Sequence, residues 1–174
     1  MEIWDADAPG ADHLVAVGAG EGRGAEPGET VAPPAILMID DDEEDFLLTR
    51  DVLRSAFGAE FRLDWVSTWD DAMAEIGRRR HGVYLLDYCL GRRDGIELVR
   101  EAIGRGCDAP IILLTGNGDR DVDLEAMRAG AADYLVKGEI TAVLIERAIR
   151  YALVRQRSNR QVRRQVSWEM PDIL

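Results

Sequence analysis

Acidic side chains gather where two short apolar segments of the sequence end. Asp40 and Asp41 follow the apolar residues 36–39, and Asp87 ends the apolar segment 83–87. Carboxylates that lie within a few ångströms of one another do not all stay ionised unless a cation joins them. Oxygen ligands, some of them from water, suit Mg²⁺ better than a soft transition metal. If the fold brings these segment ends together, we expect a magnesium site there.

A hydroxyl and an ammonium end two later apolar segments. Thr115 ends residues 110–115, and Lys137 ends residues 134–137. Lys137 is the single lysine among 21 basic residues, and its compact ammonium differs from the planar fork of arginine. A carboxylate nucleophile, a divalent cation, an ammonium and a hydroxyl together suit phosphoryl transfer onto an aspartate. The metal and the lysine would offset the charge on the phosphoryl oxygens.

From residue 35 onward, apolar segments typical of strands alternate with segments of helical spacing. Five strand–helix repeats with short connections predict an α/β fold, a flavodoxin-like, doubly wound, five-stranded parallel sheet (βα)5 with an extended C-terminal helix. Such sheets bind ligands at the carboxyl ends of their strands, which is where the residues above fall. The predicted strands are residues 36–39, 61–66, 83–87, 110–115 and 134–137, and the predicted helices are residues 43–57, 68–80, 94–105, 121–128 and a last helix from Thr141.

Composition divides the chain into three parts. Residues 1–34 are rich in glycine, alanine and proline and contain seven acidic residues and one arginine, a net charge of −6. Such a segment cannot bury enough apolar surface to fold, so we expect a flexible acidic leader. Residues 35–153 hold the five repeats and form the folded domain. Residues 154–174 continue the last helix and end in an apolar tail.

The overall charge and the cysteines exclude several classes of protein. The chain has 33 acidic and 21 basic residues, a net charge of −12, which argues against nucleic acid as a partner. Two cysteines cannot make a disulfide framework and suit a reducing compartment. No apolar segment approaches the ~18 residues of a membrane helix, and the N-terminus lacks the features of a secretory signal. We therefore expect a soluble, cytoplasmic protein without membrane contact.

The last helix carries a weak coiled-coil pattern. Its seam has residues spaced alternately three and four apart, two of the seven being polar: Ile145, Ala148, Ala152, Arg155, Asn159, Val162 and Val166. The apolar tail, residues 166–174, follows it, so we hypothesise a homodimer through the last helix and the tail. We interpret the five arginines between residues 155 and 164 as a solvent-exposed helix face. An acidic protein surface or nucleic acid are the alternative contacts for them.

Four segments of the chain, in this order and at these spacings, resemble the receiver domain of bacterial two-component response regulators. They are residues 36–42, 83–87, 111–116 and 133–137, and Gly95 and residues 129–131 also match. The resemblance covers about residues 35–153, which it identifies as a receiver domain. One departure is Gly138, because receivers usually have proline after the lysine. This puts the loop after Lys137 in doubt as a docking surface but leaves the chemistry intact.

The resemblance implies a role for each residue of the acidic site. Asp87 would accept a phosphoryl group from the phosphohistidine of a histidine kinase or a phosphotransfer protein. Asp41 would bind Mg²⁺ directly and Asp40 mainly through water. Asp87 and the backbone carbonyl of Cys89 would complete the protein ligands. Lys137 would pair with the phosphoryl oxygens.

The resemblance also implies how the phosphorylated state is sensed and how long it lasts. Thr115 would hydrogen-bond the phosphoryl group, and Tyr134 would move into the space that Thr115 vacates. The alternative for Tyr134 is an ordinary half-buried strand tyrosine. Cys89 and Asn117 occupy the positions that tune hydrolysis of the acyl phosphate in this family.

The leading hypothesis is a stand-alone receiver, a Mg²⁺-dependent phosphoacceptor rather than an enzyme, which signals by conformational switching and docking without an effector of its own. The alternative is the receiver portion of a larger signalling enzyme, a diguanylate cyclase or hybrid histidine kinase, linked through the last helix.

A phosphatase of the haloacid dehalogenase type would use Asp40 and Asp42. That family needs threonine or valine where Glu44 stands, and this chain has no room for its cap. A transcription factor is disfavoured because no helix-turn-helix segment follows.

Overall fold

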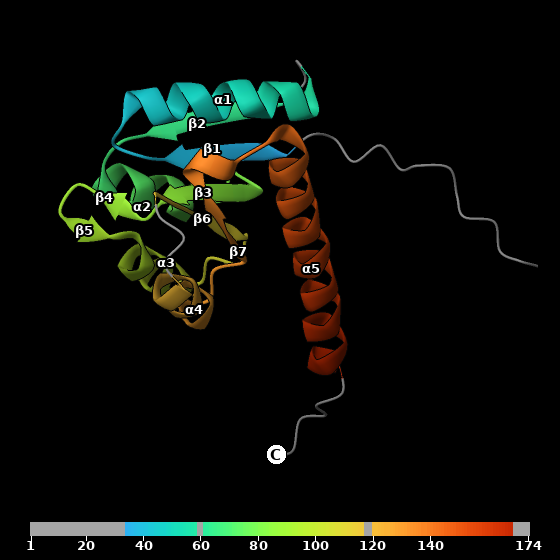
Figure 1. The fold of residues 1–174 in the computed structure, drawn as a ribbon. Coiled ribbons are helices and arrows are strands. Elements are labelled where there is room, and N and C mark those ends of the chain that lie inside the picture. The colour runs from blue at the N-terminus through green and yellow to red at the C-terminus, as the bar shows by residue number, and fades with distance from the viewer. Residues whose placement is uncertain (1–33, 59–60, 117–119, 169–174) are drawn as a thin grey trace, which may run out of the picture. The chain divides into compact units, whose positions relative to one another are not determined.

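The computed structural model describes residues 34–58, 61–116 and 120–168 (Figure 1). The predicted leader up to residue 33, Asn117 and residues 169–174 of the predicted tail lie outside these ranges. The elements are, in chain order, β1 (Ala35–Ile39), α1 (Glu43–Phe57), β2 (Arg62–Val66), α2 (Trp69–Arg78), β3 (Val83–Asp87), β4 (Cys89–Leu90), β5 (Arg93–Asp94), α3 (Gly95–Gly104), β6 (Ile111–Thr115), α4 (Arg120–Ala129), β7 (Asp133–Val136), the 3-10 helix η1 (Lys137–Glu139) and α5 (Ala142–Trp168).

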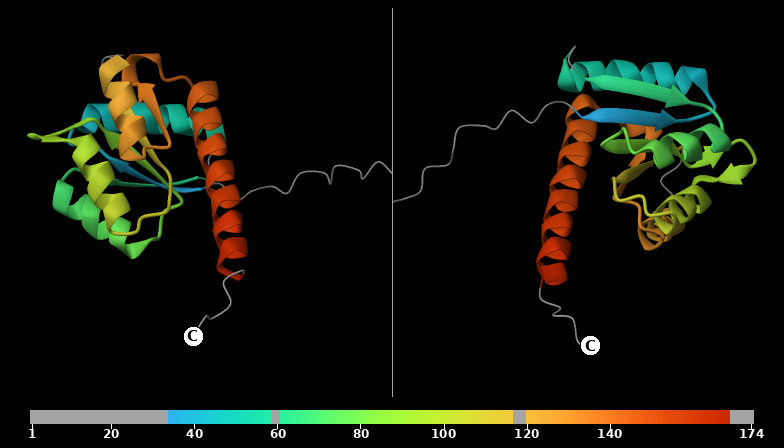
Figure 2. Two further views of the ribbon diagram at one scale, coloured as in Figure 1. Left: turned by 90° about the horizontal axis from the view of Figure 1, so that it is seen from below. Right: turned by 180° about the vertical axis from the view of Figure 1, so that it is seen from behind.

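The five longer strands form one parallel sheet in the order β2-β1-β3-β6-β7. Helices α1 and α5 cover one face of this sheet, and α2, α3 and α4 cover the other (Figures 1 and 2). The direction of winding reverses between β1 and β3, which makes their carboxyl ends the switch point where ligands bind. The predicted flavodoxin-like, doubly wound (βα)5 fold with an extended last helix is confirmed.

Alternate residues of the central strands enter two separate cores. Ile36 and Met38 of β1 pack in the core beneath α1 and α5, whereas Leu37 and Ile39 pack in the core beneath α2, α3 and α4. Strands β1, β3 and β6 are almost wholly buried, while the edge strand β2 is partly exposed. Strands covered on both faces are apolar along their length, which explains the unbroken apolar segments of the sequence.

The helices begin at capping residues. The carboxylate of Asp42 accepts a hydrogen bond of 2.8 Å from the backbone N–H of Glu44. Thr68 caps α2 and Asp94 caps α3 in the same way. Such caps satisfy backbone donors that the first helical turn leaves without partners. Asp42 therefore has a local structural role and fixes the first turn of α1 beside the sheet edge.

The structure differs from the predicted elements around Asp87 and Lys137. Strands β4 and β5 form a hairpin of two residue pairs directly after β3, too short to show in the alternation of the sequence. The last paired residue of β7 is Val136, which lies opposite Thr115. Lys137 was predicted to end this strand, but it begins the 3-10 helix η1 instead. The strand ends one residue early because its partner β6 ends there.

Helix α5 uses the predicted seam within its own domain. Ile145, Ala148 and Ala152 are buried in the core beneath α1 and α5, so the interpretation of these positions as part of a dimer seam is wrong. The spacing identified an apolar face, and the sheet covers it. Like the other described helices, α5 lacks an apolar stretch that could span a membrane.

Hydrogen bonds and an ion pair connect the second half of α5 to the residues that precede β6 and β7. Gln156 donates a hydrogen bond of 2.8 Å from Nε2 to the carbonyl oxygen of Asp108, and Arg160 donates one of 2.9 Å to its carboxylate. Arg155 donates to the carbonyl oxygen of Ala132 at 3.3 Å. Arg155, Arg157 and Arg160 are exposed nonetheless, as predicted for a solvent-exposed helix face, and Asp108 is one carboxylate rather than an acidic surface.

Replacing Asp108 with alanine is expected to loosen the second half of α5. The ion pair is partly exposed, so we expect a modest effect, about a threefold to tenfold faster amide hydrogen exchange near residue 160. Hydrogen–deuterium exchange with mass spectrometry measures this, with the exposed Arg157→Ala as the matched control. Equal exchange in both variants would show that the contact does not hold the helix.

Candidate functional site

Three carboxylates converge at the carboxyl edge of the sheet. Asp40, Asp41 and Asp87 each offer an oxygen atom, and these atoms all lie within 4.8 Å of one another. Their proximity follows from the register, because Ile39 of β1 pairs with Leu86 of β3 and the next residue of each strand is an aspartate. The structure thus brings together the acidic residues that the sequence singled out.

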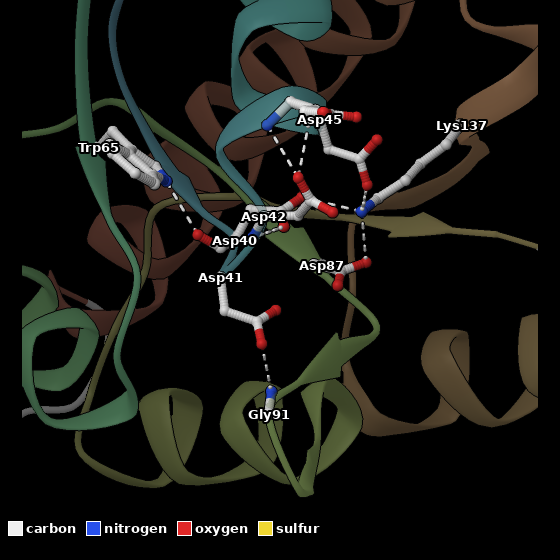
Figure 3. A network of polar contacts seen from close by, with 9 residues as sticks. Asp40, Asp41, Asp42, Asp45, Trp65, Asp87, Gly91 and Lys137 are labelled. Atoms are coloured by element: carbon white, nitrogen blue, oxygen red, sulfur yellow. Dashed lines mark hydrogen bonds and ion pairs between the residues drawn. The ribbon is translucent and has the colours of Figure 1, made fainter.

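The three carboxylates differ in burial and in partners (Figure 3). Asp40 is fully buried, and its Oδ1 accepts a hydrogen bond of 2.9 Å from the backbone N–H of Asp42. Asp87 is buried as well, whereas Asp41 is exposed and accepts a hydrogen bond of 3.1 Å from the N–H of Gly91. The cluster therefore has two interior oxygen donors and one that faces solvent.

Lys137 reaches into this cluster from the residue after β7 (Figure 3). Its Nζ lies 2.8 Å from Asp40 Oδ2, 3.0 Å from Asp87 Oδ1 and 2.6 Å from Asp45 Oδ2. Burial works against the charge of Lys137, but the hydrogen bonds to these three carboxylates raise its pKa above the usual value for lysine. Lys137 therefore stays an ammonium, which donates hydrogen bonds to Asp40 and Asp45 and forms an ion pair with Asp87.

Burial also changes the acidity of the carboxylates. The pKa of Asp87 is raised to about 6, chiefly by burial and in smaller part by the neighbouring Asp40, against the opposing effect of the Lys137 ammonium. Burial likewise raises the pKa of Asp40, which Lys137 and the Asp42 N–H counteract. One ammonium thus compensates the clustered negative charge incompletely, and a divalent cation beside these groups would favour their ionised forms.

The donor set fits magnesium. All side-chain donors of the cluster are carboxylate oxygens, which hard divalent cations prefer. Three carboxylates leave coordination positions for water and substrate oxygens, as Mg²⁺ favours in phosphoryl-transfer sites. The resemblance to receiver domains adds the backbone carbonyl of Cys89 to this donor set. Cys89 lies two residues after Asp87, and its side chain is exposed.

The loop that carries Cys89 is closed by Gly95. The N–H of Gly95 donates a hydrogen bond of 2.6 Å to the carbonyl oxygen of Tyr88. A Cβ atom on Gly95 would lie only 2.5 Å from the backbone carbonyl oxygen of Asp87 and 3.1 Å from Tyr88 Cα. Glycine is required here because the loop and the start of α3 approach each other so closely.

Replacing Gly95 with alanine is expected to shift the loop after Asp87. We expect a loss of about 1–3 kcal/mol in the free energy of unfolding and about tenfold weaker Mg²⁺ binding. Urea unfolding and a Mg²⁺ titration followed by tryptophan fluorescence measure both effects. The control is Gly104→Ala in α3, where a Cβ would meet no atom within 4 Å. A Gly95→Ala protein as stable as the wild type would contradict the close approach.

The remaining predicted residues lie around the cluster with different degrees of burial. Thr115 is buried at the end of β6, next to β7 in the sheet. Tyr134 is half-buried on β7 and packs against the core beneath α2, α3 and α4. The Cys89 thiol is exposed, but local desolvation and the neighbouring Asp87 raise its pKa, which does not favour a reactive thiolate.

Sequence reasoning missed two residues of the site. Asp45 is the third partner of Lys137, and it lies one helical turn after the Asp42 cap of α1. Trp65 donates a hydrogen bond of 2.8 Å from its indole to the carbonyl oxygen of Asp40 and stacks on Phe46 at a centroid distance of 4.8 Å. The signal for Trp65 was its place near the end of the strand that neighbours β1.

The fold and the site together define a class of protein. It is a doubly wound parallel sheet with clustered carboxylates and one lysine at its carboxyl edge. The model of the family described as "Response regulator receiver domain" matches residues 36–149 of the sequence. This chain belongs to the receiver domain family of two-component response regulators.

Relatives and solved structures agree with this family. The chain is 37% identical over 90 residues to the regulatory protein LuxO of Vibrio cholerae, a match covering 50% of this chain and 20% of LuxO. It is 28% identical over 135 residues to the C4-dicarboxylate transport transcriptional regulatory protein DctD of Rhizobium meliloti, covering 76% of this chain and 29% of DctD. The matches thus span between a fifth and three tenths of these two curated relatives.

The solved structures support the fold. The signal receiver domain of a putative LuxO repressor from Vibrio parahaemolyticus superposes with a TM-score of 0.65 at 22% identity, covering 75% of this chain and 97% of that one. NtrX from Brucella abortus superposes with a TM-score of 0.64 at 25% identity, covering 76% of this chain and 29% of NtrX. The aligned part of NtrX is thus a minor portion of a longer chain.

Proposed function

We propose that this receiver domain accepts a phosphoryl group on Asp87 in a Mg²⁺-dependent reaction. The donor is the phosphohistidine of a histidine kinase or of a phosphotransfer protein. The observation that carries the proposal is the arrangement around Asp87, where Asp40, Asp41 and the ammonium of Lys137 share one sheet edge. Free cysteines suit the cytoplasm as the place of this reaction.

Each residue has a separate task in the proposed reaction. Asp87 attacks the phosphorus as a carboxylate, and the bond from phosphorus to the histidine nitrogen breaks. With a pKa of about 6, Asp87 is largely ionised at neutral pH. Lys137 pairs with the phosphoryl oxygens. Mg²⁺, held by Asp40, Asp41, Asp87 and the carbonyl of Cys89, would offset negative charge on the same oxygens.

Thr115 and Tyr134 would convert phosphorylation into a change of shape. The Thr115 hydroxyl would donate a hydrogen bond to the phosphoryl group and draw the end of β6 inward, and Tyr134 would fill the space left behind. Cys89 and Asn117 would tune how fast the acyl phosphate hydrolyses. The protein would thus be a phosphoacceptor whose own chemistry is limited to this self-phosphorylation and slow dephosphorylation.

The output of the switch is docking onto a partner. As a stand-alone receiver, residues 35–153 would act through a kinase, a phosphotransfer protein or a second copy, without an attached effector. The alternative remains the receiver portion of a larger signalling enzyme linked through residues 154–174, and the longer relatives favour it. A homodimer through α5 would have to use its outer side, where Val143, Tyr151 and Val154 are exposed.

Intact-protein mass spectrometry tests the proposed function. The protein is incubated with acetyl phosphate or phosphoramidate in Mg²⁺, and the same reaction is run in EDTA and with the Asp87→Asn variant. We expect one added phosphoryl group that requires both Mg²⁺ and Asp87. Light scattering on the same samples reports whether phosphorylation changes the oligomeric state. A wild-type protein that gains no mass in Mg²⁺ would refute the proposal.

A further inference from the structure

The side chain of Asp45 forms an ion pair with the ammonium of Lys137, which is the cation that the proposed reaction needs. We propose that Asp45 is a positioning residue that competes with the phosphoryl group for the ammonium of Lys137. It thereby sets the phosphodonor concentration at which Asp87 is modified. This inference rests on the proposed function and adds an inhibitory contact to it.

Three carboxylates surround the ammonium of Lys137 in the resting protein, and it donates hydrogen bonds to two of them, Asp40 and Asp45. Its ammonium has three N–H donors, and three carboxylates lie within 3.0 Å of Nζ: Asp45 at 2.6 Å, Asp40 at 2.8 Å and Asp87 at 3.0 Å. The contact to Asp45 is the shortest of the three. A phosphoryl oxygen that pairs with Lys137 must therefore replace one of these carboxylates.

Burial indicates which carboxylate gives way. The side chain of Asp40 has no exposed surface and that of Asp87 only 9%, whereas that of Asp45 is 35% exposed. Asp40 and Asp87 also belong to the proposed magnesium site, and among the described residues the cluster within 4.8 Å does not include Asp45. A partly exposed carboxylate exchanges its protein partner for water at little loss. Asp45 is therefore the partner that the phosphoryl group displaces.

Charge adds to this competition. The carboxylate of Asp45 is held at the site by the first turn of α1, where the Asp42 cap fixes the backbone. A phosphodonor brings further negative charge to the same ammonium, and like charges at this separation repel. Asp45 thus opposes the arrival of the phosphoryl group in two ways, by occupying Lys137 and by repelling the incoming anion.

A purely structural Asp45 would behave differently. A carboxylate in the first turn of a helix also interacts favourably with the helix dipole. Losing that interaction would change stability without changing the dependence of the reaction on donor concentration. The donor concentration at half-maximal rate is therefore the readout that separates competition from structural support.

The test compares Asp45→Asn with wild type in the initial rate of Asp87 phosphorylation. Phosphoramidate is the donor, Mg²⁺ is saturating, and intact mass is the readout. We expect the half-maximal donor concentration to fall by about threefold to tenfold, with the maximal rate changed by less than about twofold. Asp45→Glu keeps the charge and should restore the wild-type value.

The matched control is Asp42→Asn in the same acidic turn. It removes one negative charge, and asparagine caps a helix as well as aspartate does, so α1 is preserved. An Asp45→Asn protein that behaves like this control or like wild type would overturn the inference while the proposed function stands. A lower maximal rate at unchanged half-maximal concentration would also overturn it, because Asp45 would then orient Lys137 for the reaction. A wild-type protein that takes up no phosphoryl group would remove both proposals.

Discussion

Replacing Lys137 with methionine is expected to slow the phosphorylation of Asp87 by about a hundredfold or more. The ammonium lies 3.0 Å from Asp87 Oδ1, and no other lysine exists in the sequence to substitute for it. A fixed charge aimed at oxygens that gain charge in the transition state is typically worth this much in rate. Phosphoramidate with saturating Mg²⁺ and intact mass as the readout measures the effect.

Lys137→Met is also expected to lower the stability of the metal-free protein. Methionine leaves Asp40, Asp45 and Asp87 around a position that no longer holds a cation. Because Lys137 is 18% exposed, we expect the free energy of unfolding to fall by about 2–3 kcal/mol, below the loss for a fully buried pair. Mg²⁺ should recover part of it, since a ligand that binds only the folded state stabilises it. Urea unfolding with Mg²⁺ and with EDTA measures both.

Lys137→Arg is the matched control for this prediction. Arginine keeps the positive charge but presents it as a planar fork on a longer side chain. We expect it to recover most of the stability and little of the rate. An arginine variant that is phosphorylated at the wild-type rate would show that charge alone is needed at this position. The presence of lysine rather than arginine at position 137 would then have no functional reason.

The sheet and the main acidic cluster could be predicted from the sequence because they rest on local signals. Central strands covered on both faces are unbroken apolar segments, and in a parallel sheet such strands align their carboxyl ends. Once β1 and β3 are neighbours, Asp40 and Asp87 have to meet at one edge. The position of the cluster thus follows from two strands and their order.

Asp45 could not be found in this way. Six acidic residues in succession, residues 40–45, leave open which of them after Asp40 and Asp41 faces the sheet edge. Helical spacing defines a broad apolar face but not the rotation of the first turn. The cap at Asp42 sets that rotation and points Asp45 toward Lys137, which is information that only the three-dimensional arrangement holds.

The covering partner of the apolar face of α5 could not be predicted from the sequence for a related reason. A spacing of three and four identifies residues that need to be covered, such as Ile145 and Ala152, but the covering surface is a matter of tertiary structure. Here the sheet supplies it. Gln156 and Arg160 contact Asp108, which lies 48 and 52 positions earlier in the sequence. The spacing of apolar residues along one helix does not predict such long-range contacts.

Asp87→Asn is expected to remove the phosphorylation site and, in the absence of metal, to stabilise the fold at neutral pH. The pKa of Asp87 is about 6 in the folded protein against an ordinary value of 3.8. The folded state therefore binds this proton more tightly than the unfolded state. Ionised Asp87 costs stability above pH 6, whereas below about pH 4 the group is protonated in both states and the cost disappears.

The rise in the pKa of Asp87 from 3.8 to about 6 corresponds to a loss of at most about 3 kcal/mol in the free energy of unfolding. Asparagine cannot ionise, but it also gives up the contact with Lys137, so we expect a net gain of about 1–2 kcal/mol at pH 7.5. The gain should be nearly constant above pH 6 and should shrink as the pH falls from about 6 to about 4, between the pKa values of the folded and unfolded states. Urea unfolding in EDTA across this range measures it, with the exposed Asp51→Asn as the control.

Magnesium is expected to reverse the order of stability. The wild-type cluster gains binding energy from Mg²⁺ that the variant, with one carboxylate fewer, largely lacks. An Asp87→Asn protein that is less stable than wild type at pH 7.5 in EDTA, or whose difference from wild type is constant with pH, would refute this account. A phosphorylation-dead variant that is more stable than wild type only without metal would mean that the strain of the clustered carboxylates is retained for metal binding and phosphoryl transfer.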